Sequence, residues 1–72
     1  MEFIRVNFDA RDIRDVLANG NVVGQTETEL SVPSNFYLIT LSGEGFTPLS
    51  WLGIVTGTLP AEPLLIRFNK IR

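Results

Sequence analysis

Short runs in which apolar and polar residues alternate, each closed by residues typical of turns, recur along the whole of this 72-residue chain. Residues 4–8 (IRVNF) and 64–68 (LLIRF) show the pattern near the two ends of the chain. Successive side chains of a strand point to opposite faces of its sheet, so a period of two places the apolar set on one face. Six or seven such runs, with turn signals roughly every eight to twelve residues, predict an all-β fold, a small antiparallel β-sandwich.

The turn residues divide the chain into the expected strands: 2–9, 13–18, 21–23, 27–32, 36–41, 46–55 and 64–69. Asn19-Gly20 indicates a hairpin, because both central positions of a type I′ turn need a positive φ. Pro48 and Gly53 limit the stretch 46–55 to an edge or bulged strand. Residues 9–15 (DARDIRD) form either one helical turn or a polar loop, and the loop is favoured because few apolar residues follow at helical spacing.

The size of the chain predicts one domain over residues 1–72, which buries only ~60% of the surface of its unfolded form. The chain has no cysteine, so no disulfide reinforces it. Its 44% hydrophobic and 19% charged residues describe a folded chain. No apolar run approaches the ~20 residues needed to span a bilayer, so we expect no membrane insertion. The first residues do not resemble a signal peptide, which predicts a cytoplasmic location if this is the whole protein.

The residue inventory excludes most common chemistry. Histidine is absent, which removes the commonest general base near neutral pH and the commonest metal ligand. The serines have no histidine to activate them, and Lys70 is the only lysine. Six basic residues in a chain of net charge -2 are too few for the basic surface of a nucleic-acid binder. The sequence therefore predicts a protein that is not an enzyme, holds no cofactor and no metal, and binds no nucleic acid.

Two groups of carboxylates are candidate sites. Glu27 and Glu29 lie two apart on an expected strand, so both would point the same way, as an acid and base pair requires. A solvated strand face is the better interpretation, since nothing indicates a cleft. Asp9, Asp12 and Asp15 could serve a hard cation, but Ca²⁺ loops use alternate-residue spacing, and the neighbouring arginines compete for these carboxylates.

From residue 16 to residue 46 the turn residues and their spacing resemble those of a PEGA-type domain. The matching stretches are 18–26 (ANGNVVGQT), 30–35 (LSVPSN), 37–42 (YLITLS) and 44–46 (EGF). The sequence departs from the family where Glu27 replaces a proline, Asn35 a glycine, and Glu44 and Phe46 the proline and tyrosine of the closing turn. The resemblance implies a compact antiparallel sandwich, often a module attached to larger proteins, with no catalytic residues to carry over.

Large apolar residues on an outer face are the main functional signal. If Tyr37 faces the core, the parity of residues 36–41 turns Phe36 and Leu38 outward. The same parity turns Leu65 outward, and one of the adjacent residues Trp51 and Leu52 must point out as well. Such residues mark either a partner surface or a strand covered on both faces, by residues 9–15 or by the connection 53–63.

We expect a structural or protein-interaction module that packs against itself or a neighbouring domain through Phe36, Leu38, Trp51 and Leu65. A small domain also gains stability by associating, which favours this interpretation. The alternative is a small-ligand binder, for instance of carbohydrate, in which Trp51 and Tyr37 stack on the ligand beside Thr56 and Glu44.

Overall fold

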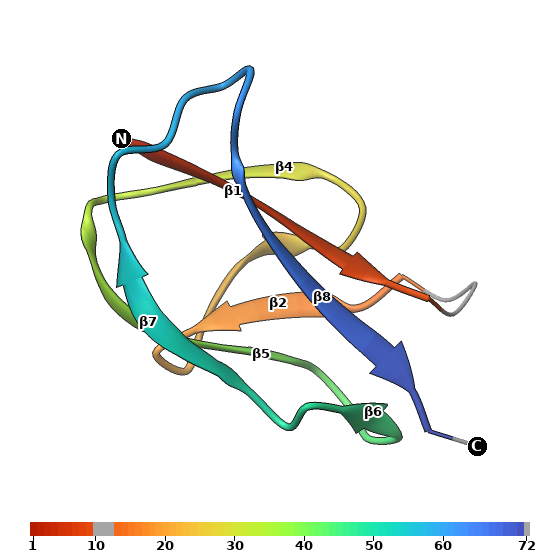
Figure 1. Ribbon diagram of the computed structural model, residues 1–72. Coiled ribbons are helices and arrows are strands. Elements are labelled where there is room, and N and C mark those ends of the chain that lie inside the picture. The colour runs from red at the N-terminus through yellow and green to blue at the C-terminus, as the bar shows by residue number, and fades with distance from the viewer. Residues whose placement is uncertain (10–12, 72) are drawn as a thin grey trace.

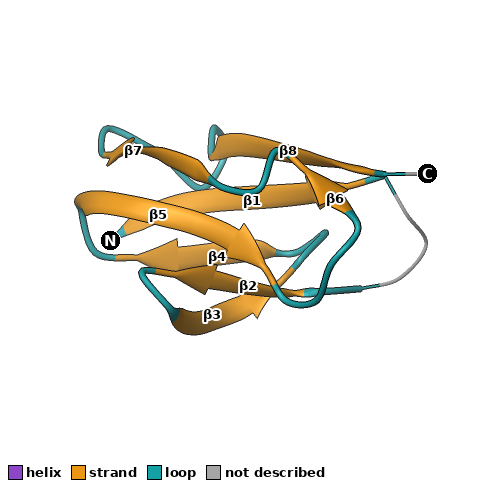
Figure 2. Ribbon diagram, turned by 90° about the horizontal axis from the view of Figure 1, so that it is seen from below, coloured by secondary structure: helices purple, strands orange, loops and turns teal. Residues whose placement is uncertain are grey.

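The computed structural model describes residues 1–9 and 13–71, and within them the chain forms strands and no helix (Figure 1). The eight strands are β1 (Glu2–Phe8), β2 (Asp15–Ala18), β3 (Asn21–Gln25), β4 (Glu29–Val32), β5 (Asn35–Leu41), β6 (Phe46–Thr47), β7 (Trp51–Val55) and β8 (Leu64–Lys70). They form two four-stranded sheets that pack together (Figure 2). The predicted all-β sandwich is confirmed.

Sheet A has the strand order β4-β1-β8-β6, and sheet B has the order β3-β2-β5-β7. The strand pairs are antiparallel except for β1 and β8, the first and last strands, which run parallel over Ile4–Phe8 and Leu64–Phe68. This pair differs from the purely antiparallel sandwich that was predicted. A parallel pair needs a long crossover connection, and here residues 9–63, which hold the other six strands, supply it.

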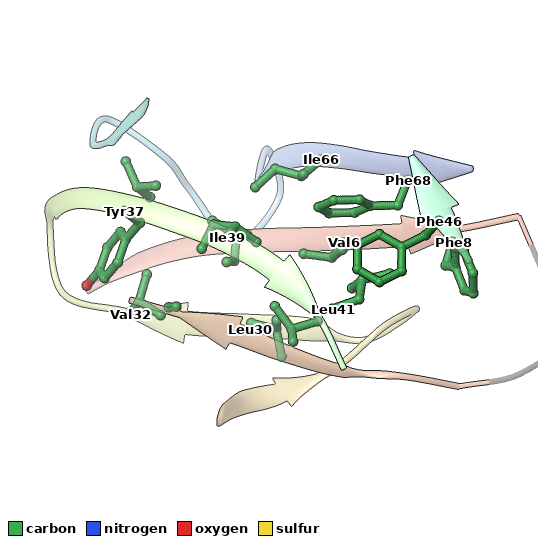
Figure 3. Packing of buried hydrophobic residues seen from close by; sticks show 14 residues of the cluster. Val6, Phe8, Leu30, Val32, Tyr37, Ile39, Leu41, Phe46, Ile66 and Phe68 are labelled. Atoms are coloured by element: carbon green, nitrogen blue, oxygen red, sulfur yellow. The ribbon is translucent and has the colours of Figure 1, made fainter. Parts of the chain in front are cut away.

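The hydrophobic core lies between the sheets (Figure 3), and the alternating runs supply it as predicted. In β1 and β8 every second residue is buried, and these two sets face the buried residues of β5 across the sandwich. Three aromatic rings fill one end. Phe46 meets Phe68 edge-to-face at 5.7 Å between centroids and meets Phe8 at 6.5 Å. Tyr37 lies with the buried set, and its hydroxyl donates to the Pro33 carbonyl at 2.7 Å.

The predicted Asn19-Gly20 hairpin is confirmed, with φ of 52° and 85° at its two central residues. Asn19 also ties the hairpin to β5. Its backbone N–H donates to the Leu38 carbonyl, and its side-chain Oδ1 accepts from the Leu38 N–H, both at 2.9 Å. The asparagine side chain therefore extends the ladder between β2 and β5 by one step beyond Ala18, where β2 ends.

The stretch 46–55 is two strands instead of the single strand that was predicted. β6 pairs with β8 in sheet A, and β7 pairs with β5 in sheet B, so the chain changes sheets at residues 48–50. Pro48 lies in this crossing, and the Thr47–Pro48 peptide bond is cis. Both strands lie at a sheet edge, which confirms the edge position inferred from Pro48 and Gly53.

Residues 10–12 lie outside the described residues. The choice between a helical turn and a loop over residues 9–15 therefore stays a prediction. On either side of this segment, Asp9 accepts a hydrogen bond from the Lys70 backbone N–H, and Asp15 begins β2. The second strand therefore starts two residues later than the sequence predicted.

Glu2 fastens the first strand to two loops. Its carboxylate accepts hydrogen bonds from the Ser34 hydroxyl at 2.6 Å, and from the Thr58 backbone N–H at 2.9 Å and hydroxyl at 2.7 Å. The Thr58 hydroxyl in turn accepts from the Phe3 N–H at 2.7 Å. The hydrogen bonds from Ser34 and then Thr58 favour the charged form and lower the Glu2 pKa from 4.5 to about 2.

Because of Glu2, the stability of the fold is expected to depend on pH in the acidic range. A carboxylate whose pKa is depressed on folding contributes stability above its unfolded pKa of 4.5, and this contribution is lost as the pH falls through the folded value of about 2. We expect Glu2→Gln to lower the Tm at pH 7 and to narrow the gap to wild type as the pH approaches 2. Thermal melts by circular dichroism across this range measure it, with Glu29→Gln on an exposed position of β4 as control. A constant gap between wild type and Glu2→Gln at every pH would contradict the assignment.

Candidate functional site

The outer face of sheet B carries a cluster of exposed apolar side chains. β5 contributes Phe36 and Leu38, which are 55% and 43% exposed, and β7 contributes Leu52 and Ile54, at 63% and 66%. The strand register places Phe36 directly opposite Ile54 and Leu38 directly opposite Leu52. Because directly opposed residues share a face and lie close together, the four side chains form one apolar patch.

The patch arises from the parity of the two strands. Tyr37 and Ile39 of β5 are buried in the core, as is Val55 of β7. Because side chains alternate between the two faces of a strand, the neighbours of these residues on each strand face solvent. Farther along the same face, Leu17 of β2 pairs with Val22 of β3, and Val22 is also exposed. The apolar character of this face therefore reaches across all four strands of sheet B.

Charge is nearly absent from this sheet. Among the residues of the four strands of sheet B, Asp15 at the start of β2 is the single charged one. Side chains of this size and exposure present on the order of 100 Å² each, so the four-residue patch presents roughly 400–500 Å² of apolar surface. That area lies within the range of roughly 300–600 Å² of the largest apolar patch on a typical monomeric protein, and such patches are often functional.

Two of the four predicted interaction residues lie together, and two lie elsewhere. Phe36 and Leu38 lie in the patch. Leu65 is exposed but lies on the outer face of sheet A, opposite Arg5 of β1, on the far side of the sandwich. Trp51 points inward, half-buried, and packs against the core. The four residues named from the sequence therefore do not form one surface.

Leu52 and Ile54 are the residues that the sequence reasoning missed. The signal was present, because one of Trp51 and Leu52 had to face outward, and the inward position of Trp51 assigns that role to Leu52. Gly53 makes the inward position of Trp51 feasible: a methyl group on Gly53 would lie 3.0 Å from atoms of the indole ring. The indole thus occupies space that a side chain at residue 53 would need.

One alternative was that the connection 53–63 covers the outer face of β5. Residues 53–55 instead belong to β7 beside β5, and Thr58 hydrogen-bonds to Glu2 and Phe3 of β1 in sheet A. The other candidate cover, residues 9–15, includes residues 10–12, which lie outside the described part of the chain. Phe36 remains exposed among the described residues.

The weighed carboxylate sites are dispersed. Glu27 lies in the turn before β4 with a φ of 65°, and its Oε1 accepts the Phe8 backbone N–H at 2.7 Å. Glu29 is an exposed residue of β4, so the expectation that both glutamates share a strand is wrong. Glu27 instead closes the end of β1. Asp12 lies outside the described residues, and the described residues contain no group of three acidic, histidine or cysteine side chains that could hold a metal ion.

The residues named for a carbohydrate platform are also separated. Tyr37 is only 7% exposed, and Trp51 packs against the core, so neither offers an open ring face. Because β5 and β7 are antiparallel, Thr56 after the end of β7 and Glu44 after the end of β5 lie at opposite ends of sheet B. Within the described residues the molecule has no pocket.

Comparison with known proteins gives no match: no family model matches the chain, and no curated protein or solved structure does so. The described residues form no helix long and apolar enough to cross a membrane.

Proposed function

We propose that this protein is a non-catalytic interaction module that binds a protein partner through the outer face of sheet B. The observation that carries the proposal is the pair of opposed, exposed apolar contacts, Phe36 with Ile54 and Leu38 with Leu52, on a nearly uncharged face. The resemblance of residues 16–46 to PEGA-type domains favours the same class of role, since it implies a module attached to larger proteins.

The shape of the site favours a protein over a small ligand. Small-molecule sites are concave and enclose most of the ligand, whereas this patch is the face of a sheet. Protein interfaces have an apolar centre from which charged residues are depleted, and a large aromatic residue commonly supplies much of the binding energy. Phe36 is the aromatic residue of the patch, and the face around it carries no lysine, arginine or glutamate.

Two exposed leucines on opposite sheets provide a matched test. A photo-crosslinking residue is placed at residue 52 in one sample and at residue 65 in another, and each is irradiated in an extract of the host cells. A protein captured from residue 52 but not from residue 65 is then purified and titrated calorimetrically. We expect Leu38→Lys to weaken its binding by about 10–100-fold, because a charge replaces a buried apolar contact.

Leu65→Lys is the control, since it adds the same charge to the outer face of sheet A. We expect it to change the affinity by less than about twofold, as for a residue outside the interface. Equal weakening by both variants would contradict the proposal, and so would capture from residue 65 as efficient as capture from residue 52.

A further inference from the structure

The two sheets end in four edge strands, and three of them carry features that discourage pairing with another chain. β3 contains a bulge opposite Val16 and Leu17, β6 has only two residues, and β4 is short, exposes Glu29 and is followed by Pro33. Bulges, short length, charge and proline are the usual protections of a sheet edge. β7 has five residues, pairs in regular register with β5 and carries no charge. Among the described strands, β7 is the edge that is open to a further strand.

The backbone groups that β7 presents at this edge belong to Leu52 and Ile54. On β5, the N–H and carbonyl of Leu38 bond to Asn19, which lies on the β2 side. Neighbouring residues of a strand direct these groups to opposite sides, so Tyr37 and Ile39 direct theirs to β7, where they face Gly53 and Trp51. The same alternation on β7 turns the N–H and carbonyl groups of Leu52 and Ile54 away from β5.

We propose that β7 pairs with β7 of a second copy of this chain, antiparallel and about a two-fold axis at Gly53. In this register Leu52 of each copy lies opposite Ile54 of the other, and the two pairs exchange four backbone hydrogen bonds. Gly53 meets Gly53 of the second copy at the axis, in a non-hydrogen-bonded pair, where the Cα atoms approach to about 4.5 Å. The result is a continuous eight-stranded sheet.

The lack of charge in this segment favours a second copy as the occupant. Residues 45–61 contain no charged side chain, so the acidic groups that give the chain its net charge of -2 lie outside the contact. Two copies therefore meet without like-charge repulsion, and a two-fold interface joins the same surface of both. Each Leu52 also gains an Ile54 as a directly opposed apolar neighbour, the kind of cross-strand pair that stabilises a sheet.

Pairing through β7 would also enlarge the surface that binds a protein partner, an inference that rests on the proposed function. A standard interface buries about 800 Å² on each partner, and one patch of roughly 400–500 Å² falls short of it. Pairing through β7 places the two patches side by side on one sheet face, because opposed residues share a face. The merged face reaches the area that a specific protein partner needs.

Amide exchange on the wild-type protein tests the pairing directly. We expect the amide protons of Leu52 and Ile54 to exchange at least about tenfold more slowly at a protein concentration of about 1 mM than under dilute conditions. Sedimentation at about 1 mM should give the mass of a dimer. The amides of Gly53 and Trp51, which face β5 in both states, should keep their rates. A monomer at about 1 mM would overturn the proposal, and so would a dimer whose Leu52 and Ile54 amides exchange at the dilute rate.

Two variants separate the edge from the face. Ile54→Pro removes an outward N–H, which an edge strand tolerates, and we expect it to raise the dimer Kd at least about tenfold. Phe36→Ser changes the face and leaves the edge backbone intact, so the Kd should change less than about threefold. If Phe36→Ser dissociates the dimer as strongly as Ile54→Pro, the copies pack face to face and the edge proposal is wrong. Loss of partner binding in Leu38→Lys would still support the proposed function in that case.

Discussion

Phe68→Ala is expected to lower the free energy of unfolding by about 3–5 kcal/mol. Phe68 is fully buried, lies opposite Phe8 in the parallel pair of β1 and β8, and meets the ring of Phe46 edge-to-face at 5.7 Å. Truncating a buried phenylalanine costs about 3–5 kcal/mol of unfolding free energy, because the cavity closes only in part. A chain of this length has roughly 4–10 kcal/mol in total, so the variant loses about a third of its stability or more. Urea unfolding followed by circular dichroism measures the change.

Leu65→Ala is the matched control for Phe68→Ala, three residues earlier on the same strand. Its side chain faces solvent on sheet A, so its truncation should change the unfolding free energy by less than about 0.5 kcal/mol. If Phe68→Ala remains within about 1 kcal/mol of wild type, the aromatic end of the core is not the main source of stability. The contrast between the two variants tests the parity of β8, on which the separation of core and surface depends.

Local sequence patterns predicted the strands well because their information is local. The alternation in residues 4–8 and 64–68 directly reflects which face is buried. The Asn19-Gly20 signal is equally local, since it depends only on the backbone preferences of two residues. These signals sufficed for the all-β class, the sandwich and the edge position of residues 46–55.

The pairing of strands is non-local, and local sequence patterns did not predict which strands pair. Nothing near residues 46–55 indicates that the chain leaves sheet A and enters sheet B at Pro48. The parallel pairing of β1 with β8 depends on residues about 60 apart. Glu27 illustrates a third gap: its positive φ and its bond to Phe8 place it in a turn, although its polarity fits the alternation of the following strand.

For the same reason, the sequence predicted only two of the four residues of the apolar patch. The parity of β5 alone turned Phe36 and Leu38 outward, so local reasoning found them. Leu52 and Ile54 join them only through the register between β5 and β7. Leu65 shares their exposure but belongs to the other sheet, which parity within one strand does not reveal.

Arg14 joins three parts of the fold. Its Nη1 donates to the Ser42 carbonyl at 2.8 Å and to the Glu44 carbonyl at 3.1 Å, in the loop that leads from β5 to β6. Its guanidinium lies 5.2 Å from the centre of the Phe8 ring. Gly43 leaves room for it, because a methyl group there would lie 2.6 Å from Nη1. The side chain thus ties the loop between the two sheets to the end of β1.

Arg14→Ala is expected to lower the unfolding free energy by about 2 kcal/mol, because two carbonyl groups lose a charged donor and Phe8 loses a cation–π contact. In a domain of this size the loss corresponds to a fall in Tm of roughly 10 °C. Arg14→Lys should recover only part of it, since an ammonium lacks the planar guanidinium group that stacks on an aromatic ring such as Phe8. Arg67→Ala, at an exposed position of β8, is the control and should change stability by less than about 0.5 kcal/mol. Full recovery by lysine would show that charge alone suffices, and an Arg14→Ala melt equal to that of Arg67→Ala would contradict the role of Arg14 as a tie between the sheets.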